Sequence, residues 1–83
     1  MSFTKILAEI HVMEKRGGAE NACRRLFQKL RSLTPRKVVH IKEKGVSHFV
    51  QRIASLDGCV LVTDVGRIDL TQVEMIVVYA NTS

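Results

Sequence analysis

The sequence predicts a single-domain α+β protein, and three observations support this fold class. The chain has 83 residues, which suits one domain with a modest core. One segment repeats its apolar residues at the spacing of an amphipathic helix, and several short runs rich in Val and Ile are typical of strands. Over residues 1–83 we expect the order β-α-β-α-β-β. That order folds as a two-layer sandwich, in which a four-stranded mixed sheet carries two helices on one face.

The first segment, residues 3–14, fits two patterns. Its alternation of residues from Ile6 to Val12 suits a strand that is covered on one side, whereas Phe3, Ile6, Leu7, Ile10 and Met13 form a helical stripe. The β-branched Val12 is favoured in a strand, so we expect a strand. If the segment is a helix, the chain has three or four helices before a β-hairpin around Gly66. That is the outline of a winged helix, our second choice of fold.

Two later segments predict helices. From Ala19 to Leu33 the apolar stripe consists of Ala22, Cys23, Leu26, Phe27, Leu30 and Leu33. Gly17-Gly18 precedes this helix and Thr34-Pro35 ends it. From Val46 to Leu56 the stripe consists of Val46, Phe49, Val50, Ile53 and Leu56, and Asp57-Gly58 ends the helix. In a winged helix, this second helix would be the recognition element.

The remaining segments predict strands. They are Val38–Ile41, the apolar run Cys59–Thr63 and the segment Val73–Tyr79, with a turn at Asp64–Arg67. In the last strand, Ile76 and Val78 share the face opposite to Met75 and Tyr79.

Positive charge is concentrated in the middle of the chain. The formal net charge is +5, and from Lys15 to Arg52 there are eleven Lys or Arg against two acidic residues. After Ile53 the only basic residue is Arg67. Such a block attracts polyanions, and we expect nucleic acid as the partner.

Two basic loops that contain glycine are the candidate phosphate sites. Lys15-Arg16-Gly17-Gly18 precedes the first predicted helix and Lys42 to Ser47 precedes the second. In the predicted sheet both loops follow the carboxyl ends of strands, so they would meet at one edge. Basic residues of the first helix would flank them. The predicted nucleic-acid-binding residues are Lys15, Arg16, Gly17, Arg24, Arg25, Arg31, Lys42, Lys44 and Ser47.

The stretch from Val39 to Ser47 looks like a strand, a basic glycine-containing loop and a helix start, and Glu9–Gly18 looks like a strand that runs into a basic loop. With the predicted order, these features resemble the Alba family of archaeal chromatin and RNA-binding proteins. They are also similar to the C-terminal domain of bacterial translation initiation factor three. The resemblance implies a β-α-β-α-β-β fold and backbone contacts from Lys15, Arg16, Lys42 and Lys44.

Aromatic residues and cysteines are assigned mainly to the core. Phe27 and Phe49 lie on apolar stripes, so we expect no exposed stacking platform. Recognition of duplex DNA or structured RNA through backbone and shape follows from that expectation. Cys23 and Cys59 are expected to be buried thiols in a reducing compartment, which fits a cytoplasmic location. They could pair only if folding brought their Cα atoms within about 7 Å of each other, and nothing in the sequence demands this.

Other functions have less support in the sequence. No cysteine, carboxylate or histidine pattern typical of catalysis or metal binding stands out, so we expect neither an enzyme nor a cofactor. No apolar stretch is long enough to span a membrane, and the first residues lack the order of a signal peptide. The alternative is a small protein-interaction module, an adaptor, inhibitor or subunit that docks on an acidic partner. Ile76 and Val78 would be its exposed apolar residues, and an edge strand there could form a homodimer.

Overall fold

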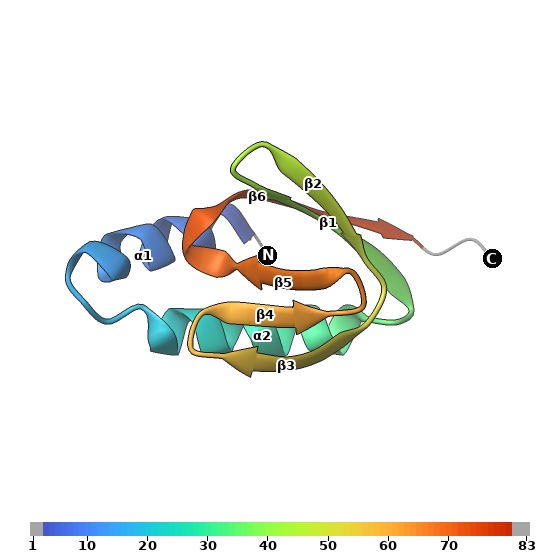
Figure 1. Ribbon diagram of the computed structural model, residues 1–83, viewed down its shortest axis with the longest axis horizontal. Helices are drawn as coiled ribbons and strands as arrows, with labels where there is room; N and C mark the ends of the chain where they lie inside the picture. Colours follow the sequence, from blue (N-terminus) through green and yellow to red (C-terminus); the bar gives the residue numbers. More distant parts are fainter. Residues whose placement is uncertain (1–2, 81–83) are drawn as a thin grey trace.

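A computed structural model describes residues 3–80 and places both helices before all the strands (Figure 1). The general α+β class is confirmed, but the four-stranded mixed sheet with two helices on one face is wrong. Two three-stranded antiparallel sheets are present instead, with the strand orders β2-β1-β6 and β3-β4-β5. The elements are α1 Phe3–Lys15, α2 Glu20–Leu33, β1 Lys37–Glu43, β2 Val46–Val50, β3 Ile53–Asp57, β4 Val60–Thr63, β5 Gly66–Asp69, the short 3₁₀ helix η1 Leu70–Gln72 and β6 Val73–Ala80.

The first segment is the helix α1, so the predicted strand is wrong. Its buried residues are Ile6, Leu7 and Ile10, which follow the helical stripe, whereas Val12 is 51% exposed. The alternation up to Val12 therefore has no structural meaning. Most of the other residues of this segment, such as Ala8 and Glu9, favour helix, and together they outweigh the single β-branched Val12.

The predicted helix Ala19–Leu33 is confirmed as α2, with Ala19 as its N-cap. The four buried residues Ala22, Cys23, Leu26 and Leu30 lie on the predicted stripe. At the other end, the Thr34 N–H donates to the Leu30 carbonyl.

The predicted helix Val46–Leu56 is wrong, because this segment forms β2 and β3. Residues 51 and 52 separate the two strands. Val50 and Ile53 are buried as predicted, but they lie in different sheets. Val, Ile and Phe favour strands as well as apolar helix faces, and strands this short can mimic a helical stripe. The winged-helix alternative loses its recognition helix for the same reason.

The predicted strands are confirmed as β1, β4 and β6, and the turn at Asp64 is confirmed between β4 and β5. The hairpins are tight, since Glu43 pairs with Val46 and Asp57 pairs with Val60. At the first turn, Lys44 and Gly45 have φ values of 46° and 81°. Positive φ at both central residues is typical of a type I′ hairpin turn.

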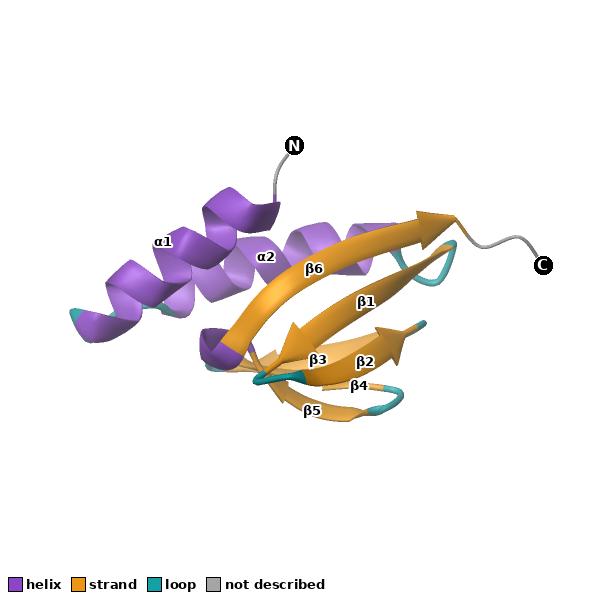
Figure 2. Ribbon diagram, turned by 90° about the horizontal axis from the view of Figure 1, so that it is seen from above, coloured by secondary structure: helices purple, strands orange, loops and turns teal. Residues whose placement is uncertain are grey.

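The core lies where the helices and the inner faces of both sheets meet (Figure 2). The chain passes from the first sheet to the second through residues 51–52 and returns through η1. Fully buried side chains come from every layer, and examples are Ile10, Leu26, Ile41, Leu61 and Leu70. Neither α1 nor α2 is long and apolar enough to cross a membrane, and no other helix in residues 3–80 is.

The prediction that the cysteines are free thiols is wrong. Cys23 of α2 and Cys59 of the β3–β4 turn form a disulfide, with Cα atoms 5.4 Å apart. They are 36 residues apart in the sequence, so only the tertiary fold brings them together. The bridge ties α2 to the β3-β4-β5 sheet.

Candidate nucleic-acid interface

The predicted binding residues lie in three separate places. Lys15 ends α1, and Arg16 and Gly17 form the turn to α2. Three arginines lie on α2, while the remaining residues belong to the β1–β2 hairpin: Lys42, Lys44 and Ser47. Because α1 replaces the expected first strand, the two loops do not share an edge of a parallel sheet. Figure 1 draws the α1–α2 turn at one end of the molecule, away from the β1–β2 turn.

The backbone of the α1–α2 turn is occupied by hydrogen bonds to α1. The N–H groups of Arg16 and Gly18 donate to the Met13 carbonyl at 3.1 and 2.9 Å, and that of Gly17 donates to Glu14 at 3.0 Å. These three N–H groups are therefore not free to bind a phosphate. The side chains of Lys15 and Arg16 remain exposed and available.

A cleft between α2 and β3 brings arginines together from distant parts of the chain. Arg24 and Arg31 line a hollow of about 440 Å³, with Phe27 and residues of β3. Arg31 also lines an adjoining hollow of about 490 Å³, together with Arg52. Both hollows share Ala54, so we treat them as one feature and call it the arginine cleft, defined by Arg24, Arg31 and Arg52.

Of the three predicted arginines on α2, Arg24 and Arg31 line the arginine cleft and Arg25 does not. The Arg31 guanidinium lies 5.7 Å from the centre of the Phe27 ring, a cation–π contact that helps to orient it. Arg25, in contrast, pairs with Glu9 of α1. Sequence reasoning missed Arg52, because the expected helix Val46–Leu56 placed it on a different surface.

Several carboxylates in residues 3–80 accept hydrogen bonds from backbone N–H groups and do not pair with arginine. The Asp64 carboxylate accepts hydrogen bonds from the N–H groups of Gln51 and Arg52, both at 3.2 Å. Glu74 accepts from Gly45 N–H at 2.7 Å. Two of the ion pairs that arginine forms are those of Arg25 with Glu9 and of Arg67 with Asp57. Although Glu20 and Asp64 also line the arginine cleft, none of its three arginines has a carboxylate partner there.

Lys42 and Ser47 lie on the outer face of the β2-β1-β6 sheet, opposite the core. Their strands are in register there, since Lys42 pairs with Ser47 and His40 pairs with Phe49. We call this surface the open sheet face. Its side chains are Val38, His40, Lys42, Ser47, Phe49, Met75, Val77 and Tyr79.

Aromatic rings gather on the open sheet face, so the predicted core position of Phe49 is wrong. Phe49 and Tyr79 are 55% and 48% exposed. The alternation of Ser47 and Phe49 with His48 and the buried Val50 was the signal that could have found this face. Burying a Phe side chain typically stabilises a fold by about 1.5–3 kcal/mol, and half of that ring stays in solvent here.

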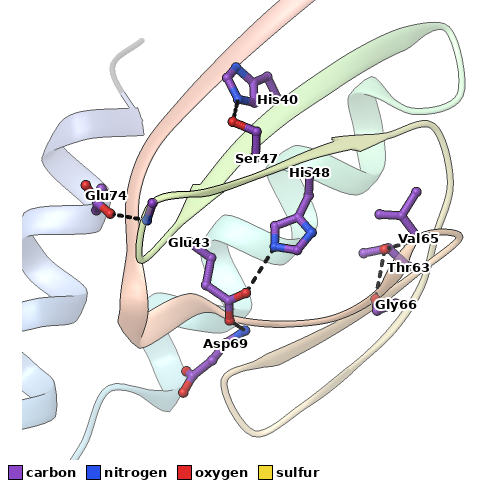
Figure 3. A network of polar contacts seen from close by, with 10 residues as sticks. His40, Glu43, Ser47, His48, Thr63, Val65, Gly66, Asp69 and Glu74 are labelled. Atoms are coloured by element: carbon purple, nitrogen blue, oxygen red, sulfur yellow. Dashed lines mark hydrogen bonds and ion pairs between the residues drawn. The ribbon is translucent and has the colours of Figure 1, made fainter.

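His40 lies between the two aromatic residues. Its ring stacks on Phe49 with centroids 4.6 Å apart and an interplanar angle of 14°, and it faces Tyr79 at 6.4 Å and 22°. His40 Nε2 is also hydrogen-bonded to Ser47 Oγ at 2.9 Å. Figure 3 shows this pair, and separately the His48–Glu43 contact that points toward β5.

The exposed apolar residues proposed for the last strand are also corrected. Ile76 and Val78 are partly buried and pack against the core. Met75 and Tyr79, on the other face of β6, are the exposed apolar residues of this strand.

Comparison of the chain with models of protein families, with curated protein sequences and with solved structures found no match. The resemblance to the two nucleic-acid-binding families stays a prediction, and the β-α-β-α-β-β order on which it depended is not the observed one.

Proposed function

We propose that this protein is a non-catalytic nucleic-acid-binding protein that holds the phosphate backbone. The observation that carries the proposal is the arginine cleft, where Arg24, Arg31 and Arg52 line two adjoining hollows without carboxylate partners among residues 3–80. Of the two carboxylates that line the cleft, Asp64 accepts hydrogen bonds from the N–H groups of Gln51 and Arg52, and Glu20 forms no ion pair with the three arginines. The net charge of +5 also favours association with a polyanion.

The chemistry of arginine supports a phosphate partner. A guanidinium group presents several N–H donors in one plane and can bind two phosphate oxygens at once. Arg24 and Arg31 are seven residues apart on α2, two turns of helix along one face, so they can contact separate phosphates of one backbone. Lys15 and Arg16 would add contacts from the α1–α2 turn, and Lys42 and Lys44 from the β1–β2 hairpin.

The test is a double substitution in the arginine cleft, Arg24→Ala with Arg31→Ala. Binding of labelled duplex and single-stranded oligonucleotides is followed by fluorescence anisotropy at several salt concentrations. Each lost phosphate contact should reduce the slope of log affinity against log salt by about 0.9 for duplex DNA and about 0.7 for single strands. Because phosphate contacts do not depend on base sequence, affinity should fall alike for all sequences.

The matched control is Arg67→Ala. Arg67 is exposed but pairs with Asp57 on the β3-β4-β5 sheet, and neither residue lines the cleft. This variant removes one positive charge, so it is compared with the single variants Arg24→Ala and Arg31→Ala, which each remove one as well, and it should leave the salt slope nearly unchanged. Equal losses in the control and in the cleft variant would mean that only net charge matters, and this result would reject the cleft as the site.

The second candidate function is a protein-interaction module that docks on an acidic partner. The observation that favours it is the exposed apolar surface of Met75, Phe49 and Tyr79, which could pack against another protein. A homodimer through the same surface belongs to this candidate. It would be favoured if no nucleic acid bound at moderate salt while the protein self-associated in sedimentation experiments.

A further inference from the structure

We infer that the open sheet face binds single-stranded nucleic acid by stacking unpaired bases against Phe49 and Tyr79. This inference rests on the proposed function, because it supplies the class of nucleic acid that the backbone contacts would hold. It also reverses the expectation of a duplex, which depended on the absence of exposed aromatic residues.

The three rings form a column across the sheet. Phe49 of β2 and Tyr79 of β6 come from the strands on either side of β1, and His40 of β1 lies between them. The interplanar angles of 14° and 22° keep the rings nearly parallel. One side of each terminal ring faces His40, while the other side has no ring partner in residues 3–80. Two flat aromatic faces therefore remain for planar ligands.

The open sheet face is not covered by the rest of the described chain. In Figure 2 the strands β6, β1 and β2 lie in front, and no described helix or strand passes over them. The helices pack instead on the inner residues of these strands, which include Val39 and Ile41. The hydrogen bond between His40 Nε2 and Ser47 Oγ orients the His40 ring, so the column is organised before any ligand binds.

The charge of this face matches a nucleic-acid backbone. Lys42 projects from the same face of β1 as His40, and Lys44 lies at the adjoining turn. The acidic residues of β1 and β6 are Glu43 and Glu74. Glu43 binds His48 and the Asp69 N–H, and Glu74 binds the Gly45 N–H. Phosphates beside the stacked bases would therefore meet lysines and no free carboxylate of these strands.

The same features favour a single strand over other occupants. In a duplex the base faces are already stacked on each other, so only unpaired bases can stack on protein rings. A second copy of the chain in a symmetric dimer would bring two Lys42 residues and two molecules of charge +5 together. A single strand of nucleic acid supplies unpaired bases that can stack on the exposed rings, and its negative phosphates complement the lysines of this face.

The experiment uses variants that keep apolar bulk but remove the aromatic ring: Phe49→Leu, Tyr79→Leu and the double variant. Probes are oligothymidylate and oligouridylate of about 12 nucleotides, a duplex of equal length, and heparin. Stacking of one base typically changes affinity by about 5- to 150-fold, so each variant should bind the single strands at least about fivefold more weakly. Binding of duplex and heparin should not change. Val65→Ala, at an apolar residue that is 48% exposed in the β4–β5 turn, is the control.

A second readout is Phe49→Trp. The chain contains no Trp, so this variant carries a single fluorophore on the open sheet face. Stacking on a base should quench its emission when oligothymidylate is added, whereas heparin should bind without quenching. Quenching by single strands alone would support the inference.

Four outcomes overturn or support the inference, and they separate it from the proposed function. If no probe binds at low salt, both proposals fail. If the single strands bind but the leucine variants bind them as tightly as the parent chain, the inference fails and the phosphate-binding function stands. If the parent chain is a dimer that the leucine variants dissociate, the open sheet face is a protein interface and the inference fails. A loss confined to single strands supports it.

Discussion

At the scale of single residues, Lys44 adopts a conformation that its side chain does not favour. Its φ of 46° lies in the left-handed region, where residues other than Gly, Asn and Asp are disfavoured. Asn followed by Gly is the preferred pair for a type I′ turn, and Gly45 already occupies the second position. A lysine at this tip costs stability and is consistent with a binding role for its charge.

Lys44→Asn should therefore have opposite effects on stability and on binding. The free energy of unfolding should rise by about 0.5–1 kcal/mol, as measured by urea denaturation, because Asn tolerates positive φ. Nucleic-acid affinity should fall and the salt slope should decrease by up to about 0.9, because one cation is lost. Lys5→Gln, on exposed α1, is the charge control. If affinity changes equally in both variants, Lys44 makes no specific contact.

At the scale of elements, Glu43 links the two sheets. His48 Nε2 of β2 donates to Glu43 Oε1 at 3.1 Å, and the Asp69 N–H of β5 donates to Glu43 Oε2 at 2.7 Å (Figure 3). The Glu43 side chain is only 23% exposed, so water replaces these bonds poorly. Glu43 also lies where the register of β1 and β6 shifts.

Glu43→Ala should lower the free energy of unfolding by about 1–3 kcal/mol, because the Asp69 N–H loses its charged acceptor. Urea denaturation measures this change. Glu14→Ala, at an exposed carboxylate of α1, should change stability by less than about 0.5 kcal/mol. A double-mutant cycle with His48→Ala isolates the pairwise part, and a coupling energy near zero would show that the sheets are held by other contacts.

At the scale of the whole molecule, the Cys23–Cys59 disulfide links helix α2 covalently to the β3-β4-β5 sheet, the two parts of the chain that form the arginine cleft. It joins α2 to the β3–β4 turn across a loop of 36 residues. A cross-link of that span restricts the unfolded chain and is worth about 4 kcal/mol in the chain-entropy treatment. In a domain with a modest core, that is a large share of the usual stability.

Reduction should therefore lower the free energy of unfolding by about 2–4 kcal/mol. Urea denaturation of the same protein with and without a thiol-free reductant measures the difference without changing any side chain. The Cys23→Ala, Cys59→Ala double variant should be insensitive to the reductant. Identical denaturation midpoints for oxidised and reduced protein would show that the bridge does not contribute to stability.

Much of the local structure could be predicted from residue patterns, but the candidate site could not. The positive block from Lys15 to Arg52 was visible, and Arg24 and Arg31 were identified as candidates. Their convergence with Arg52 depends on β3 packing beside α2, which no local pattern encodes. The exposure of Phe49 was missed because its helical spacing assigned it to the core.

The sequence by itself determined the α+β class, the helix α2 and the strands β1, β4 and β6. In these segments the periodicity is unambiguous, so the amphipathic pattern and the local conformational preference agree. Only the tertiary structure decided that Val46–Leu56 is two strands and that Cys23 meets Cys59. The physical reason is that a strand obtains its register and its buried side from partners that are distant in the sequence. The same partners decide which charges and rings stay exposed, and therefore where this protein can bind a ligand.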